Sequence, residues 1–445
     1  MTDISPTSEA PPAASDFPAR KVVIVALMLI ATLIAGWSIS GVVQEREARR
    51  DATLDSFRTT WGPEQVVHGP LLVVPYRLGS SRTRLYFEIA PETLKSKTVL
   101  STAEKKRGLF HATVYGAVFQ FEGSFTIPAT SSLGQDPNLD WDAAFVVVES
   151  STLSGMSVGD HFTWNGKDVA WQNCREFLDQ GECGSPSALA ARIPLSVAPA
   201  VGASFSFTGN LTLRGVGSFS QVFLGANIDA SVEGSWATPS FGGSLLPATA
   251  DVSRDGFSAR WLNADHTSAK VRSNARVIET DPANEIVSKA ALLEATPTYR
   301  MINRASKYNI LFVVLSFTTY FLFELLTKVR IHPLQYGLLG ASLTLFALLL
   351  VSFAEMIGYD AGYAVSSGLV LLQASVYTAA VTRRLGHSLA FGAMLASLFG
   401  FLYVLLSLET YSLLVGSLGL FLVLSLVMAL TQRVKWFAVA GTVGA

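Results

Sequence analysis

Five long apolar runs fill the stretch from Tyr308 to Lys435, and only a few residues separate one run from the next. Each run reaches or nearly reaches the roughly 20 residues that a helix needs to cross about 30 Å of hydrocarbon. Backbone groups in lipid must be satisfied within their own segment, and no alternation supports barrel strands. The stretch therefore predicts a membrane domain of five helices, at Tyr308–Leu326, Tyr336–Ile357, Tyr363–Val381, Leu389–Leu408 and Tyr411–Leu430.

Composition agrees with a membrane protein and argues against nucleic acid as a partner. Half of the 445 residues are hydrophobic and only 15% are charged, which is unusual for a soluble chain of this length. The formal net charge is −1 and no basic block occurs, whereas nucleic-acid-binding chains carry a basic patch or stripe. The lipid bilayer is thus the partner that composition indicates.

The N-terminal region combines a polar tail with a further apolar run. Residues 1–20 are rich in Pro, Ala, Ser and Thr and predict a disordered tail. Val22–Val43 carries no charge and follows Arg20 and Lys21, a pattern that fits either a signal peptide or a membrane anchor. The anchor is favoured for two reasons. The apolar core of a signal peptide has only about 7–15 residues, which is shorter than this run. The small-x-small sequence that cleavage would need lies deep within the run.

The distribution of Lys and Arg predicts the orientation, because loops rich in these residues stay in the cytoplasm. The turns at residues 358–362 and 409–410 carry none. With the N-terminus inside, the cytoplasmic segments carry Arg20/Lys21, Lys328/Arg330, Arg383/Arg384 and Arg433/Lys435. This predicts six spans in a bacterial inner membrane, with both termini in the cytoplasm and the segment after Val43 in the periplasm.

The spacing of apolar residues changes along the exported segment. Gln44–Thr60 predicts a short helix leading off the membrane. After it come short β-rich runs bounded by Gly, Pro, Asn and Asp, and the runs that begin at Phe205 and Phe219 are interpreted as successive strands of one antiparallel sheet. We expect a sandwich-like all-β domain, in one piece or two, with strands at Leu71–Arg77, Arg84–Ile89, Thr113–Ile127, Ala143–Ser150, Ser204–Leu213, Phe219–Val232 and Phe257–Trp261.

The predicted fold class is therefore an α-helical membrane protein with six transmembrane helices and a large all-β periplasmic domain inserted between the first and second helices. The corresponding domains are a cytoplasmic tail (1–20), an anchor helix (21–43), the periplasmic β-rich domain (44–303), the five-helix membrane domain (304–436) and a second cytoplasmic tail (437–445).

Cys174 and Cys183 are the only cysteines, and both fall in the exported segment. An oxidising compartment favours a disulfide between them. The alternative is a redox or metal-binding pair. However, two cysteines nine positions apart, with no His nearby, are poorly spaced as metal ligands. We expect no metal site and no cofactor.

Catalytic motifs are nearly absent. Residues 155–159 match the G-x-S-x-G pattern of a nucleophile elbow around Ser157. Their flanks predict a strand and a Gly-rich turn with no following helix, so the match does not indicate catalysis. The six His residues are scattered without HxxxH or HExxH spacing, and no phosphate-binding loop occurs. No catalytic residue is predicted.

Acidic residues in or beside the spans are the better candidates, because a charge buried in lipid is costly and such groups are often functional. Glu324 lies four residues before Lys328, so an interfacial i,i+4 pair is its simplest interpretation. Glu355 lies near the periplasmic end of a span that is otherwise uncharged. With Asp360 and Glu409 it would form a group of carboxylates at one mouth of the bundle, although the last two also suit wetted turns.

The chain resembles the CreD family of bacterial inner membrane proteins from about Trp61 to Trp436. In the membrane half, residues 304–324 (RASKYNILFVVLSFTTYFLFE), 332–359 and 409–436 match the family pattern. In the exported half, 69-GPLLVVPY, 239-PSFGGSLLP and 256-GFSARW stand where the family has such stretches. The family's Glu-Asp-Tyr is Glu-Thr-Tyr here, at residues 409–411, which weakens any role for that Asp.

The resemblance implies a protein of cell-envelope integrity, associated in the family with a two-component stress response, colicin tolerance and β-lactam susceptibility. It implies no catalytic residues. The favoured hypothesis is a non-enzymatic envelope protein whose partners are the bilayer and other envelope proteins or lipids. The alternatives are a transporter or lipid-handling protein, which would need an inverted repeat or broken span that the sequence lacks, and an envelope hydrolase.

Overall fold

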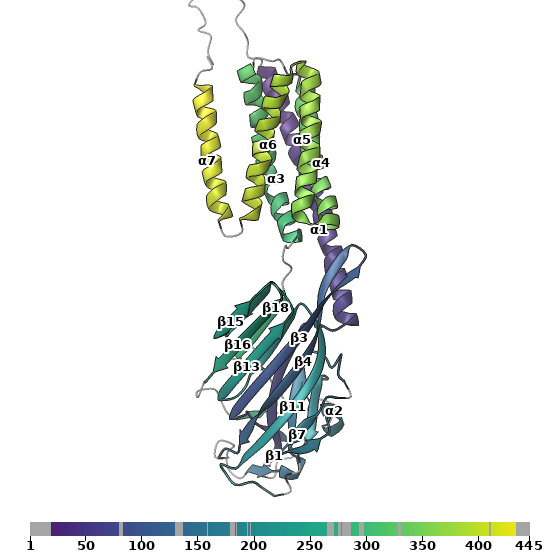
Figure 1. The fold of residues 1–445 in the computed structure, drawn as a ribbon, viewed down its shortest axis with the longest axis vertical. Helices are drawn as coiled ribbons and strands as arrows, with labels where there is room; N and C mark the ends of the chain where they lie inside the picture. Colours follow the sequence, from purple (N-terminus) through teal and green to yellow (C-terminus); the bar gives the residue numbers. More distant parts are fainter. Residues whose placement is uncertain are drawn as a thin grey trace, which may run out of the picture. The chain divides into compact units, whose positions relative to one another are not determined.

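A computed structural model describes most of the 445-residue chain. The chain divides into two compact units, here called the helical unit (Met1–Arg49 with Thr296–Ala445) and the β unit (Arg50–Ala295) (Figure 1). The structure describes residues 19–79, 83–129, 137–157, 159–178, 183, 185–193, 195, 197–264, 271–274, 277, 286–292, 298–327, 331–408 and 411–432.

Long helices build the helical unit. α3 packs against α4 and α6, and α5 also packs against α4 and α6, so these four helices form a closed bundle with α7 beside α6 (Figure 1). By length and composition α1, α3, α4, α5 and α6 can each cross a membrane, whereas the apolar stretch of α7, Leu414–Ala429, is shorter. Their bounds are α1 Ala19–Thr60, α3 Thr298–Thr327, α4 Pro333–Ile357, α5 Tyr359–Thr382, α6 Leu385–Ser407 and α7 Ser412–Thr431.

α1 is one uninterrupted helix of 42 residues. The predicted anchor and the helix predicted at residues 44–60 are thus parts of one helix, because the charged residues after Val43 continue it. α3 likewise begins well before the predicted Tyr308. The expected domain boundaries at 43/44 and 303/304 fall inside these two helices, whereas the compact units divide at 49/50 and 295/296.

The start of α4 is encoded locally. Pro333 occupies the first turn, where no backbone N–H is needed. His332 Nδ1 accepts a hydrogen bond from the Leu334 N–H at 3.2 Å, and Gln335 Oε1 accepts one from the His332 N–H at 3.2 Å. This reciprocal pair satisfies N–H groups that the first turn of a helix leaves without partners.

Small residues let the helices approach closely. A Cβ on Gly362 would lie 2.6 Å from Ala354 N, so the backbones of α5 and α4 nearly touch there. A Cβ on Gly340 would collide with the side chain of Thr32, which places α1 directly against α4. Helices in membranes associate through such close packing because lipid offers no hydrophobic driving force between them. α1 is thus an integral member of the helical unit.

The β unit contains two sheets that face each other (Figure 1). Sheet A has the order β14-β18-β12-β1-β6-β10-β9, with β2 and β5 also paired to β1 and β17 paired to β2, and sheet B has the order β15-β16-β13-β3-β4-β11-β7-β8. The bounds are β1 Gln65–Leu78, β2 Leu85–Ile89, β3 Thr93–Arg107, β4 Phe110–Thr126, β5 Pro137–Leu139, β6 Phe145–Ser150, β7 Phe162–Trp164, β8 Lys167–Val169, β9 Gln172–Asn173, β10 Ala188–Arg192, β11 Ser204–Val216, β12 Ser218–Phe223, β13 Asn227–Gly234, β14 Pro239–Gly243, β15 Thr249–Val252, β16 Phe257–Asn263, β17 Val271–Asn274 and β18 Ile286–Leu292.

One hydrophobic core fills the space between the sheets. Strand β3 of sheet B alternates strictly over this stretch, and every second residue from Leu94 to Leu100 is buried. Trp261, Phe119 and Phe207 of sheet B meet Phe219 of sheet A in this core. Alternation of buried and exposed side chains is typical of a sheet with one face in solvent, and the described strands therefore form a sandwich around a single core.

The disulfide between Cys174 and Cys183 lies on the outer face of sheet A, with its Cα atoms 6.1 Å apart. Both cysteines are buried against Val73 and Val147, whose side chains point away from the main core. This second layer explains why β1 and β6 are buried on both faces and lack alternation. Pairing of these cysteines is what the sequence analysis favoured.

The strands at Phe205 and Phe219 do not belong to one antiparallel sheet, so that interpretation is wrong. β11 lies in sheet B, and β12 lies in sheet A, where it pairs in parallel with β1. The chain changes sheets at Gly217, whose φ of 81° is accessible to glycine without strain. The predicted strand Phe219–Val232 is likewise two strands, β12 and β13, in different sheets.

Candidate functional site

Two polar clusters join α1 to the rest of the helical unit, and each is centred on a carboxylate that the sequence predicted. The Glu355 cluster consists of Glu355, Arg46 and Tyr299, and the Glu324 cluster consists of Glu324, Lys21 and Tyr336. In both clusters the carboxylate faces one cation of α1 and one tyrosine hydroxyl. The similarity of the two arrangements indicates that α1 is held at both ends of its contact with the bundle.

The Glu355 cluster joins the C-terminal turn of α4 to α1 and α3. The Glu355 side chain is only 6% exposed. Its Oε1 accepts a hydrogen bond from the Tyr299 hydroxyl at 2.6 Å, and its Oε2 lies 3.7 Å from Arg46 Nη1. A carboxylate in a low-dielectric site must be paired, hydrogen-bonded or protonated, and here hydrogen bonding and an opposite charge are both present.

Further polar contacts extend this junction along α1 and α3. Asn303 Nδ2 donates to both carboxylate oxygens of Glu47, at 2.9 Å each. Ser40 lies about two turns before Glu47 in α1, and Ser306 lies about one turn after Asn303 in α3. The hydroxyls of Ser40 and Ser306 are 2.9 Å apart. The two helices are therefore connected at two levels by polar contacts, in addition to apolar packing.

The Glu324 cluster lies at the other end of the same part of α1. Lys21 Nζ forms an ion pair with Glu324 Oε1, and the Tyr336 hydroxyl donates to Oε2 at 2.8 Å. The Ile331 N–H also donates to Oε1, at 3.2 Å. Lys21 and Arg46 are 25 positions apart, which is about 37 Å along a helix and comparable with the thickness of a bilayer. α1 is thus clamped near both ends of one membrane thickness.

The other predicted carboxylates do not join the Glu355 cluster among the described residues. Asp360 is exposed and accepts a hydrogen bond from the Tyr403 hydroxyl of α6 at 3.1 Å. Glu409 lies outside the described residues, as does Lys328, the expected i,i+4 partner of Glu324. The described partners of Glu324 come from α1 and α4 instead.

Sequence reasoning missed the residues that complete these clusters. Tyr299 and Asn303 fall in a segment that was assigned to the β-rich domain, and Arg46 was assigned to a separate helix. A third missed residue, Arg304, donates to the carbonyl oxygens of Leu406 and Leu408 at 3.0 and 2.9 Å, and so satisfies the end of α6. The signal that could have found them is their position, because each lies within about three turns of a long apolar run.

Ser157 has a structural role in a turn. Its hydroxyl accepts a hydrogen bond from the Gly159 N–H at 3.4 Å, while its own N–H donates to Asp160 Oδ2 at 2.9 Å. His161 turns its Nδ1 to the carbonyl oxygen of Gly159 at 3.2 Å. These contacts are those of a polar turn, and the next element along the described chain is the strand β7, not a helix.

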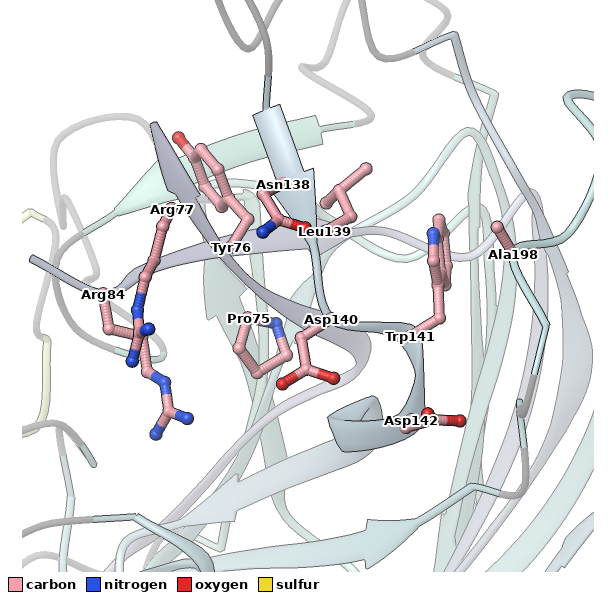
Figure 2. A pocket seen from close by; sticks show the side chains of 10 residues that line it. All are labelled: Pro75, Tyr76, Arg77, Arg84, Asn138, Leu139, Asp140, Trp141, Asp142 and Ala198. Carbon is pink, nitrogen blue, oxygen red and sulfur yellow. The ribbon is translucent and has the colours of Figure 1, made fainter. Parts of the chain in front are cut away.

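The β unit has a polar pocket of about 390 Å³ at the end of β1 (Figure 2). Figure 2 shows Arg77 and Arg84 on one side, Trp141 and Asp142 on the other, and Asp140 between them. Both signs of charge are present, so the pocket favours neither an anion nor a cation. We assign it no ligand.

Charged pairs cover the outer face of sheet B. Arg260 Nε and Nη2 donate to the two carboxylate oxygens of Asp229 at 2.7 and 2.6 Å, and Lys95 lies 3.1 Å from Glu122. Hydrogen bonding from Arg260 holds the pKa of Asp229 below its usual value. Such exposed pairs contribute little to stability.

Comparison with known proteins decides the family. The profile of the family described as Inner membrane protein CreD matches residues 18–437 of the chain. The chain belongs to the CreD family. A curated relative, Inner membrane protein CreD of Escherichia coli (strain K12), is 28% identical over 426 residues, which cover 93% of this chain and 92% of the relative. The chain is accordingly an inner membrane protein with a large β-sheet domain, and the CreD description names no enzyme activity.

Solved structures offer only distant likenesses. Two crystal structures of an M1 zinc metallopeptidase from Deinococcus radiodurans match at 9% and 8% identity, with TM-scores of 0.24 and 0.21. The matches cover 49% and 80% of this chain and 53% and 96% of the peptidase chains. At these TM-scores they carry no argument about fold or function.

Proposed function

We propose that this CreD-family protein is a non-enzymatic inner membrane protein that supports cell-envelope integrity by linking the state of its β unit to its helical unit through α1. The observation that carries the proposal is the continuity of α1 across both units. Its first part is held by the Glu324 and Glu355 clusters, and its last turns pack Phe57 against Ala112, Val114 and Val216 of the β unit. α1 therefore belongs in part to each unit, and it is the connection through which a change in one unit can reach the other.

The proposed topology has six spans, including α7, with both termini in the cytoplasm and the β unit in the periplasm. Its basis is the asymmetry of Lys and Arg described above. The partners that this arrangement offers are the bilayer and other envelope proteins or lipids on the periplasmic side.

A transporter or lipid-handling role has less support. The cavity among α1, α3 and α4, lined by Gly36, Asn309 and Phe346, holds only about 20 Å³. A cavity needs about 10–15 Å³ of such volume to hold one water, so this cavity has room for about one water and not for a substrate. An envelope hydrolase is weaker still, because the contacts of Ser157 are those of a turn.

We expect Ala52→Pro to abolish function while the protein still inserts into the membrane. Ala52 is exposed, in the part of α1 between Arg46 and Phe57. Proline in a helix interior removes a hydrogen bond and kinks the helix, at a cost of about 3 kcal/mol. The measurement is complementation of a deletion strain, scored by susceptibility to a β-lactam and tolerance to a colicin, with membrane content checked by immunoblot.

Ala52→Gly is the matched control, because it costs about 1 kcal/mol without forcing a kink. It should complement. Full complementation by a correctly inserted Ala52→Pro protein would show that a continuous α1 is unnecessary, and the linking function would have to be abandoned.

The topology makes a separate prediction. A reporter that is active only in the periplasm should work when fused after Gly215 and fail when fused after Arg330, Arg384 or Lys435, because only the first site lies in the proposed periplasmic part. Activity after Arg384 would contradict six spans, whatever the outcome at Ala52.

A further inference from the structure

Gln373 carries an exposed amide near the middle of α5. This helix runs from Tyr359 to Thr382 and is long and apolar enough to cross a membrane. Gln373 follows Asp360 by 13 positions and precedes Arg383 by 10, which is about 20 Å and 15 Å of helix. The hydrocarbon is about 30 Å thick, so the side chain cannot reach either membrane surface. Its amide therefore lies in hydrocarbon, where no water is present to bond it.

The amide of Gln373 has no hydrogen-bond partner among the described residues. Exposed serines of the described helices are satisfied differently, because each hydroxyl donates to a backbone carbonyl oxygen about one turn earlier in its own helix. These serines are Ser38, Ser352, Ser397, Ser407, Ser417 and Ser425. A glutamine amide has two N–H donors and an acceptor oxygen, and leaving them unbonded in hydrocarbon costs free energy. Gln373 therefore marks a surface that needs a polar partner.

Gln373 belongs to a stripe of exposed residues that has the spacing of a helix–helix interface. Leu369, Gln373, Val376 and Ala380 are all exposed and follow one another at intervals of four, three and four positions. We call this stripe the Gln373 seam. Such intervals are those of the a and d positions along which two helices pack side by side, and membrane helices use the same geometry. A single polar residue at an a position fixes the register of such a pair.

A second copy of this chain supplies the polar partner at the required depth. Two copies insert into a membrane with the same orientation, because the same Lys and Arg residues direct both. A two-fold axis along the membrane normal brings identical surfaces together, so each Gln373 lies at the depth of the other. The amide is complementary to itself, since the N–H of one copy can donate to the carbonyl oxygen of the other and the reverse. An unrelated helix would need a polar group at this one depth, whereas a second copy has it by symmetry.

We propose that the Gln373 seam is a dimerisation surface through which two copies of this chain associate within the membrane. The two α5 helices lie parallel, and the two Gln373 amides exchange hydrogen bonds at the centre of the interface. The surface lies wholly within the helical unit and requires only that α5 crosses the membrane. The proposal therefore does not depend on the linking function proposed above.

Oxidative cross-linking of the full-length protein in native membranes tests which surface meets a second copy. The described chain has no free cysteine, so Val376→Cys places one thiol on the seam. Copper phenanthroline should convert most of this variant into a disulfide-linked dimer. Val314→Cys is the matched control, because Val314 is also exposed but belongs to α3, which packs against α4 and α6 on the other side of the bundle from α5. It should remain largely monomeric.

The contribution of the amide is measured by counting subunits in phosphatidylcholine vesicles, with single-molecule photobleaching at increasing ratios of protein to lipid. Gln373→Leu should raise the dissociation constant of the dimer by roughly 3- to 30-fold, the range expected for polar contacts between membrane helices. Its unfolding temperature in detergent should not fall, because the monomer loses only an unbonded amide. Ser397→Ala is the control and should leave the dimer unchanged, since Ser397 bonds its own helix.

Four results would overturn the proposal. The first is a monomer at every protein density, and the second is a dimer that Gln373→Leu does not weaken. The third is equal cross-linking through the cysteines at positions 314 and 376. The fourth is a cross-link from Val376→Cys to a different membrane protein, with no dimer of this chain.

Discussion

Glu355→Ala is expected to destabilise the helical unit by about 2 kcal/mol or more and to remove the envelope phenotype. The substitution leaves the Tyr299 hydroxyl and the Arg46 guanidinium without their acceptor, and hydrogen bonds to charged groups contribute about 1.5–3 kcal/mol. Arg46 is 41% exposed, so water compensates part of its loss. Thermal unfolding of the purified protein in detergent gives the stability, and complementation of the deletion strain gives the phenotype.

Glu355→Gln separates the two interactions. It keeps an acceptor for Tyr299 but removes the attraction to Arg46, so its loss of stability should be smaller while function is still impaired. A double-mutant cycle with Arg46→Ala should give a coupling of about 1 kcal/mol, because the two residues act as one contact. Asp360→Asn is the control, since Asp360 is exposed and outside this cluster. If Glu355→Ala behaves like Asp360→Asn, the cluster does not hold α1.

Gly362→Ala is expected to destabilise the bundle by about 1–3 kcal/mol, and Gly362→Leu to prevent accumulation of folded protein. A Cβ at Gly362 would lie 2.6 Å from Ala354 N and 2.8 Å from Ala354 Cα. Both atoms belong to the backbone of α4, which cannot rotate away as a side chain could. Helix α5 would therefore have to move away from α4 along its length. Thermal unfolding in detergent measures the first variant, and yield after membrane extraction measures the second.

Gly368→Ala in the same helix is the matched control. A Cβ at Gly368 meets nothing within 4 Å, and alanine is the better helix former by about 1 kcal/mol. The same Gly-to-Ala change should thus stabilise α5 at one position and destabilise the bundle at the other. Two variants that shift the unfolding temperature in the same direction would contradict the close approach of α4 and α5.

The spacing of Gly358 and Gly362 shows how much a local motif can predict about helix packing. As a motif it crosses a turn and predicts little about packing. In the structure Gly358 ends α4 and only Gly362 faces the neighbouring helix. Which glycine makes the contact depends on how the turn directs α5, and that is a property of the pair of helices.

The sequence by itself determined the features that depend on near neighbours along the chain. The apolar runs predicted where α3 to α7 form, because burial in lipid is set by hydrophobicity over about 20 residues. The structure shows that the start of α4 is likewise set by near neighbours, through the hydrogen bonds between His332 and the first turn. The two cysteines, nine positions apart, left one structural pairing. The family resemblance was also available from the sequence, since long matching stretches carry it.

Only the tertiary structure decided which distant residues meet. Glu355 appeared as a lone charge in an apolar span, and its partner Arg46 lies more than 300 positions away in sequence. β3 went unrecognised because its exposed residues are mostly Lys and other polar residues, and its strand character depends on pairing with β4 and β13. The change of sheet at Gly217 and the continuity of α1 past Val43 have the same origin. Local propensity permits several outcomes there, and packing against the rest of the protein selects one.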